Sequence, residues 1–70
     1  MFKDPNFGVA NHIRETRLKK GWSQEELASQ CGLHRTYIGA VERNERNITL
    51  LTLARIARAL NSDIKDFFDA

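Results

Sequence analysis

The sequence predicts an all-α fold, a compact bundle of five short helices. Apolar residues recur three or four positions apart along most of the 70-residue chain, which is the period of an amphipathic helix. Glycine and asparagine residues interrupt this pattern at short intervals, as expected for helices that end and restart at tight joints. No repeat, linker or low-complexity segment divides the chain, so we interpret residues 1–70 as a single domain.

The first predicted helix spans about Asn6 to Lys20 and ends at Gly21. Its inward-facing positions are Val9, Ile13 and either Thr16 or Arg17. Lysine side chains in its last turn suit the negative end of the helix dipole.

A second helix is predicted to begin after Ser23. Ser23 followed three positions later by Glu26 is a capping box, in which a hydroxyl and a carboxylate satisfy amides of the first turn. The apolar face of this helix consists of Leu27, Ala28 and Cys31. Gly32 ends it, because a residue without a Cβ adopts positive φ at a helix C-terminus without strain.

The apolar pattern restarts directly after this glycine, on a third helix that begins near His34. Its inward positions are Leu33, Ile38 and Val41. Ala28 is small, as required where two helices cross closely after a short turn. This arrangement has the spacing of a helix-turn-helix over about residues 23–43, and another kind of compact helical hairpin is the alternative.

A fourth helix is predicted to begin after the cap residue Thr49 and to end at Asn61. Its apolar stripe consists of Leu50, Leu53, Ile56, Ala57 and Leu60. Asn44, which follows the third helix, lies where a helix end often requires a left-handed residue, and asparagine tolerates that conformation. Asp63 is predicted to cap a short fifth helix, Ile64–Phe68.

The C-terminal end carries more apolar side chains than a last short helix can bury against its own domain. These side chains are Ile64, Phe67 and Phe68. Because an uncovered apolar patch marks an interface, we predict a dimerisation region over about residues 50–70 that also includes Leu51. The expected assembly is an isologous two-fold homodimer.

Charge is unevenly distributed along the chain. The formal net charge is only +2, which does not by itself require a nucleic-acid partner. Residues 14–58 hold nine Lys and Arg against five Glu, whereas residues 59–70 hold one Lys against three Asp. A basic body with an acidic end fits a domain that places one face on phosphate, although charge on a small domain is usually a solvated surface.

The composition argues against an enzyme, a metalloprotein and a membrane protein. His12, His34 and Cys31 form no triad, and Cys31 with His34 alone does not supply the ligands of a zinc site. A single cysteine suits a reducing cytoplasm, and no apolar run approaches the length of a membrane span. We therefore expect a cytoplasmic protein with no cofactor, no metal, no membrane partner and no small-molecule ligand.

The residues of the predicted corner resemble a known family. The pattern Arg17…Gly21-Trp22-Ser23-Gln24-Glu25-Glu26-Leu27-Ala28…Gly32-Leu33-x-Arg35…Ile38…Val41-Glu42-Arg43 resembles the lambda-repressor-like helix-turn-helix regulators over nearly the whole chain. Arg35-Thr36-Tyr37-Ile38, followed by Glu42-Arg43-Asn44-Glu45-Arg46-Asn47-Ile48-Thr49, is similar to the controller proteins of restriction-modification systems. The resemblance implies a small homodimer that binds double-stranded operator DNA and regulates transcription. One departure is His34, a poor cap at a position where the family usually has Ser, Thr or Asp.

The resemblance implies that the third helix lies in the major groove, where its N-terminal side chains face base edges. The base-reading candidates are Arg35, Thr36, Tyr37 and Arg46. Arg35 is favoured because its planar fork pairs with guanine O6 and N7, and a phosphate contact is its alternative role. For Tyr37 the alternative is packing against the second helix. Gly39 and Ala40 are expected to face outward and to let the helix backbone lie close to DNA.

Further residues are expected to contact the DNA backbone: Gln24, His34, Arg43, Asn44 and Asn47. Gln24 stands at the N-terminus of the second helix, where backbone amides and the helix dipole favour an anion. A solvated loop is the alternative for the residues that follow the third helix. The family pattern also pairs an Arg of the first helix with the Glu that ends the third, so Arg17 and Glu42 are expected to form a structural bidentate ion pair.

Two other functions fit the same pattern, a phage-type repressor and an antitoxin-like adaptor whose main contact is protein. The salt dependence of binding distinguishes a DNA binder from an adaptor, because phosphate contacts weaken steeply as the salt concentration rises. RNA is disfavoured because side chains do not read the narrow major groove of an A-form helix. The operator sequence, and whether binding activates or represses, do not follow from the sequence.

Overall fold

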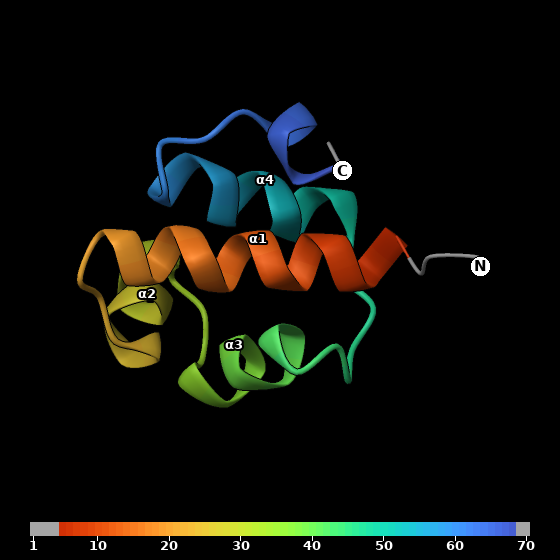
Figure 1. Ribbon diagram of the computed structural model, residues 1–70. Coiled ribbons are helices and arrows are strands. Elements are labelled where there is room, and N and C mark those ends of the chain that lie inside the picture. Colours follow the sequence, from red (N-terminus) through yellow and green to blue (C-terminus); the bar gives the residue numbers. More distant parts are fainter. Residues whose placement is uncertain (1–4, 69–70) are drawn as a thin grey trace.

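The computed structural model describes residues 5–68 and contains four α-helices and one short 3₁₀ helix (Figure 1). The elements are α1 (Pro5–Lys19), α2 (Gln24–Cys31), α3 (Arg35–Glu42), α4 (Leu50–Ala59) and the 3₁₀ helix η1 (Ile64–Phe67). Residues 5–68 form no β-strand, so the all-α prediction is confirmed. The prediction of a fifth helix is wrong, because the last element is a 3₁₀ helix of only four residues.

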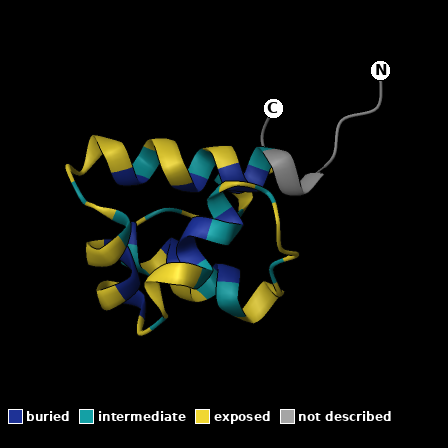
Figure 2. Ribbon diagram, turned by 90° about the horizontal axis from the view of Figure 1, so that it is seen from below, coloured by how far each residue is buried: buried dark blue, intermediate teal, exposed yellow. Residues whose placement is uncertain are grey.

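The helices surround one apolar core. In Figure 1, α4 and η1 lie above α1, and α3 lies below it. α2 packs against both α3 and α4, and α1 packs against α3 and η1. The largest fully buried side chains are Phe67, Ile13, Leu27, Ile38, Leu53, Ile56 and Val9. Since they come from all five elements, the bundle is held together by a core that no pair of helices forms alone (Figure 2).

The corner between α2 and α3 forms at the predicted residues. The backbone N–H of Glu26 donates to Ser23 Oγ over 3.0 Å, which caps the first turn of α2. The predicted role of the Glu26 carboxylate is wrong, because it accepts a hydrogen bond from the Gln30 side-chain amide, 2.8 Å away, and only the Ser23 half of the capping box caps the first turn. Gly32 ends α2 with φ at 70°, in the left-handed region that favours glycine.

At the remaining helix ends two predictions are confirmed and two are wrong. The Thr52 backbone N–H donates to Thr49 Oγ1 over 3.1 Å at the start of α4, and Asn44 is left-handed with φ at 59°, as predicted. His34 was expected to be a poor cap, and this is wrong, because its Nδ1 accepts the backbone N–H of Thr36 over 3.1 Å. Asp63 was expected to cap the last helix, but its side chain makes no cap hydrogen bond to η1.

The C-terminal apolar residues divide between core and surface. Phe67 is only 1% exposed, and its ring centroid lies 4.4 Å from that of His12 on α1. The prediction that Phe67 belongs to a dimer interface is therefore wrong, because its side chain completes the core of its own domain. Phe68 and Leu51 are exposed, as predicted. Leu50 was expected in the core stripe of α4 but is 69% exposed.

Candidate nucleic-acid interface

The N-terminal end of α3 presents polar side chains to solvent. His34, Arg35 and Thr36 are exposed, whereas Ile38 and Val41 of the same helix are buried. Figure 2 views the molecule from below, the side on which α3 lies in Figure 1. The helix is thus anchored by one apolar face and directs its first turn outward.

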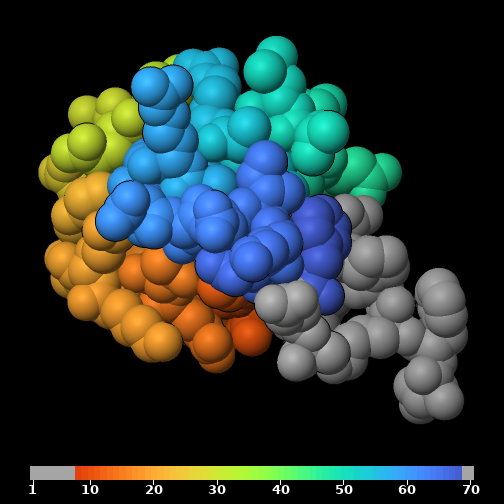
Figure 3. Space-filling view, turned by 90° about the horizontal axis from the view of Figure 1, so that it is seen from above, coloured from red at the N-terminus to blue at the C-terminus, as the bar shows by residue number. Residues whose placement is uncertain are grey.

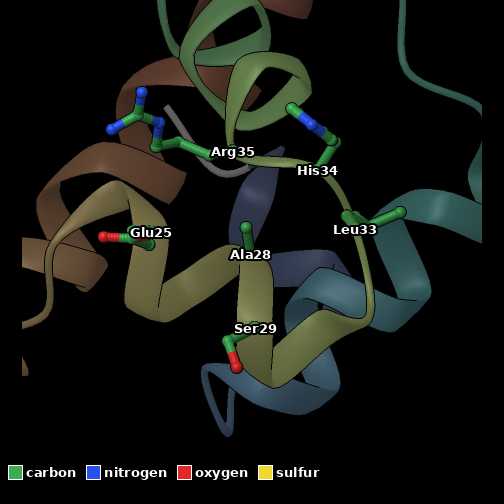
Figure 4. A pocket seen from close by; sticks show the side chains of 6 residues that line it. All are labelled: Glu25, Ala28, Ser29, Leu33, His34 and Arg35. Atoms are coloured by element: carbon green, nitrogen blue, oxygen red, sulfur yellow. The ribbon is translucent and has the colours of Figure 1, made fainter.

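The His34 ring is held against this first turn. Figure 4 shows the ring folded back toward α3, consistent with the hydrogen bond from the Thr36 N–H to Nδ1. A ring nitrogen that accepts a hydrogen bond carries no proton, so the proton of the neutral ring lies on Nε2. The cap therefore leaves one N–H donor on a side chain that is exposed to solvent.

A shallow open pocket lies between the outer side of α2 and the start of α3 (Figure 4). It is lined by Glu25, Ala28, Ser29, Leu33, His34 and Arg35. The side chains of Glu25 and Arg35 extend toward the same side of it. The pocket is the surface groove of the helix corner and is formed by residues on both sides of the Gly32 turn.

A buried polar cluster fixes the other end of α3. Arg17 Nε donates to Glu42 Oε2 over 2.7 Å, and Arg17 Nη2 donates to Glu42 Oε1 over 3.0 Å. Arg17 Nη1 also donates to the carbonyl oxygen of Trp22 over 2.8 Å. Gln24 Nε2 donates to Glu42 Oε1 over 3.1 Å. The expected bidentate pair is therefore present, and it joins α1, α2 and α3 in one cluster, Arg17–Glu42–Gln24.

Gly39 lies at this cluster rather than on the outer surface. It is buried, and a Cβ built on it would lie 3.3 Å from Gln24 Oε1 and 3.1 Å from Arg43 Nη1. The expectation that Gly39 faces outward toward DNA is wrong, because α3 turns this position toward the side chain of Gln24. The small residue there makes room for the Gln24 amide.

Tyr37 and Arg46 form a stacked pair. The Arg46 guanidinium carbon lies 5.1 Å from the centroid of the Tyr37 ring, within the range of a cation–π contact. Tyr37 is half-buried and packs against the core, whereas Arg46 is exposed. The ring therefore contacts the guanidinium of an arginine that remains exposed to solvent.

The loop after α3 carries the other predicted backbone contacts. Arg43 Nη2 lies 3.1 Å from Glu45 Oε1, and both side chains are mostly exposed. The hydrogen bond that Arg43 donates to the Glu45 carboxylate raises the pKa of Arg43 above its ordinary value. Asn47 is exposed and Asn44 is half-buried. These residues lie on the same loop as Arg46, beside the end of α3.

Two further properties concern the described part of the chain. Residues 5–68 include no group of three or more His, Cys, Asp or Glu that could hold a metal ion. None of the helices described within that range is both long and apolar enough to cross a membrane.

Comparison with known proteins gives close matches. The helix-turn-helix family model matches residues 13–67. Control protein C.SmaI of Serratia marcescens is 51% identical over 63 residues, which cover 90% of this chain and 75% of that protein. The structure of a hypothetical transcription factor from Neisseria is similar with a TM-score of 0.90 and 45% identity, over 94% of this chain and 76% of that one.

A third similar structure is the tetramer of the restriction-modification controller protein C.Esp1396I in complex with its natural 35 base-pair operator. Its TM-score is 0.85 with 39% identity, over 96% of this chain and 88% of that chain. The chain described here therefore belongs to the helix-turn-helix family of transcription regulators. Within that family it is similar to the controller proteins of restriction-modification systems.

Sequence reasoning missed two features of the structure, one on α4 and one at the turn before α3. Leu50 was placed in the core because it continues the helical spacing of α4, and no local signal shows that the core ends before it. Arg55 was counted only as a charge, but it contacts the turn between α2 and α3. That contact joins residues more than 20 positions apart, so only the three-dimensional packing reveals it.

Proposed function

We propose that this chain is a sequence-specific DNA-binding regulator of the restriction-modification controller type, which binds a palindromic operator as a homodimer. The observation that carries the proposal is the way α3 is fixed in the bundle. Its buried face and the Arg17–Glu42–Gln24 cluster hold the helix, and Arg35 and Thr36 at its start remain exposed. A helix held in this way reads a major groove with its N-terminal side chains. The proposal assigns the chain no catalysis, metal or cofactor, and it locates the activity in the cytoplasm.

Base reading is assigned to four side chains near α3, each with its own chemistry. Arg35 pairs with guanine through its fork, and Thr36 bonds a base edge or places its methyl group against thymine. Arg46 approaches the duplex from the following loop, pre-oriented by the Tyr37 ring. The fourth side chain is Tyr37, and the polar group that it offers is its hydroxyl.

Backbone contacts are assigned to groups around the reading residues. His34 offers its Nε2–H to a phosphate, and Gln24 retains one amide hydrogen beyond its bond to Glu42. Arg43 reaches a phosphate by leaving Glu45, an exchange that costs little because the ion pair is exposed. Asn44 and Asn47 complete the set on the same loop.

The proposal is tested by selecting bound duplexes from a random DNA pool and measuring affinity as a function of salt. Arg35→Ala is expected to lose discrimination at one base pair of the selected site, by about 1–3 kcal/mol. The matched control is Arg58→Ala, which removes the same charge from an exposed position on α4 and is expected to leave that discrimination unchanged.

The outcomes separate the candidate roles. If Arg35→Ala weakens all sequences equally and lowers the salt slope, Arg35 is a phosphate contact only. If the unmodified chain ignores every duplex in dilute buffer, the proposal fails, and an adaptor that binds protein takes its place.

Exposed apolar side chains support a dimer surface at the start of α4 and the end of η1. Leu51 is 74% exposed and Phe68 57%. Leu50, also exposed, precedes Leu51, and the half-buried Ile64 begins η1. In Figures 1 and 3 the start of α4 and η1 lie toward the same end of the molecule. A two-fold axis through this surface would pair two copies and set their α3 helices about 34 Å apart, one turn of DNA.

Leu51→Glu is expected to abolish dimerisation, because it places a carboxylate in an apolar interface. Sedimentation at micromolar concentration should show a monomer, and operator affinity should fall. Leu18→Glu is the control, since Leu18 is also exposed, at 55%, but the end of α1 and the start of α4 lie at opposite ends of the molecule in Figure 1. Equal effects of the two substitutions would locate the interface elsewhere.

A further inference from the structure

Arg55 on α4 holds the turn between α2 and α3 from outside the helix-turn-helix. Its Nη2 donates to the carbonyl oxygen of Cys31 over 2.9 Å and to that of Gly32 over 3.2 Å. These carbonyls belong to the last residue of α2 and to its cap, where the helix has no further N–H groups to offer. A cation at this end also opposes the negative end of the α2 dipole.

Gly32 in the turn lies close to this guanidinium. A Cβ at Gly32 would lie 3.0 Å from Arg55 Nη2 and would push the guanidinium aside, and a side chain there would also be strained by the φ of 70°. Burial raises the pKa of the Cys31 thiol above its ordinary value, and the charge of Arg55 acts in the opposite direction. The arginine, the glycine and the thiol thus share one corner, in which Cys31 is buried while Gly32 and Arg55 are exposed.

This corner leads directly to the start of α3. Only Leu33 separates Gly32 from His34, whose ring caps the first turn of the helix that carries Arg35. A change in the turn therefore moves the cap and the first outward side chains together. The opposite end of α3 is fixed independently, by Glu42 in its buried cluster.

We propose that Arg55 is a positioning residue for DNA recognition, which sets the direction of α3 by holding the Cys31 and Gly32 carbonyls and does not itself contact DNA. The recognition part of this proposal rests on the proposed function above. It assigns the C-terminal half of the chain a role in DNA recognition, besides the role in dimerisation proposed above.

The first experiment compares Arg55→Gln, Arg55→Lys and the control Arg58→Gln on the selected operator and on an unrelated duplex. All three are measured well below their thermal midpoints, with folding verified by circular dichroism. Arg55→Gln is expected to lower the ratio of operator to unrelated affinity by about tenfold, the factor associated with losing a charge-assisted hydrogen bond. Its salt slope should stay unchanged, and Arg55→Lys, which keeps a charged donor, should recover most of the ratio.

The second experiment uses Cys31 as a reporter of the turn and needs no DNA. The chain has a single cysteine, and it is 7% exposed, so the rate of its reaction with a thiol reagent under native conditions measures opening of this corner. Arg55→Gln is expected to raise that rate by about tenfold relative to Arg58→Gln. Loss of the Arg55 charge would by itself make the thiol less ionised and slower, so a faster reaction reports opening.

Each outcome has a definite meaning. An affinity ratio for Arg55→Gln within about twofold of the Arg58→Gln value overturns the proposal, even if the thiol reacts faster. A uniform loss on both duplexes with a lower salt slope also overturns it, because that is the signature of a phosphate contact. If the unmodified chain binds no duplex, the proposed function fails, and the thiol rate alone then decides whether Arg55 holds the turn.

Discussion

Glu42→Ala is expected to lower the free energy of unfolding by about 3 kcal/mol or more, because it leaves a buried arginine without its carboxylate. The side chain of Glu42 is 3% exposed and that of Arg17 is 10% exposed, so water replaces little of the lost interaction. Arg17 would keep its bond to the Trp22 carbonyl, and the Gln24 amide would lose its acceptor as well. Urea unfolding followed by circular dichroism measures the change directly.

The chain supplies a matched control for this experiment. Glu45 pairs with Arg43 at a similar distance, but both side chains are more than half exposed. Glu45→Ala is therefore expected to change stability by less than about 0.5 kcal/mol. Replacing both buried partners, as in Arg17→Met with Glu42→Leu, should be more stable than Glu42→Ala alone, since no charge is then left unpaired. Equal urea midpoints for Glu42→Ala and Glu45→Ala would contradict the role given to the cluster.

The buried cluster and the Arg55 contact act on opposite ends of α3. Glu42 connects the end of the helix to α1 and α2, and Arg55 connects the turn before it to α4. A helix of eight residues has little stability of its own. Its direction is therefore set by these contacts and by its buried face, which explains how so short an element can present side chains in a fixed geometry.

Features specified by local chemistry could be predicted from the sequence. The Ser23 cap, the left-handed Gly32 and Asn44, and the Thr49 cap each depend on residues within four positions, and all four occur where expected. The helical spacing of apolar residues likewise identified the buried faces of α2 and α3. These signals are read within one turn of chain, so they do not require knowledge of the packing.

Features that depend on packing could not be predicted in the same way. Phe67 and Phe68 are adjacent apolar residues of one type, and only the path of η1 across α1 decides that the first is buried and the second exposed. Gly39 was assigned outward because it lies off the apolar positions Ile38 and Val41, whereas the Gln24 and Arg43 side chains cover it in the structure. The His34 cap depends on the orientation of the imidazole ring, which a ranking of residue types by capping preference does not describe.

The adjacent phenylalanines provide the second large expected effect. Phe67→Ala is expected to destabilise the domain by about 3–5 kcal/mol, because it empties a fully buried site against His12. Phe67 is the buried residue of η1, which has no side-chain cap, so the loss should also release that segment from α1 and α4. The thermal midpoint should fall by more than about 10 °C.

Phe68→Ala removes the same side chain from a position that is 57% exposed. It should change the stability of the monomer by less than about 1 kcal/mol, while weakening the proposed dimer. Because dimerisation makes apparent stability depend on protein concentration, both variants are melted across a concentration series, and the values are compared at the dilute limit. At that limit only Phe67→Ala should remain strongly destabilised. If the two variants melted together there, Phe67 would not be the anchor of the C-terminal segment, and the division of these residues between core and interface would be wrong.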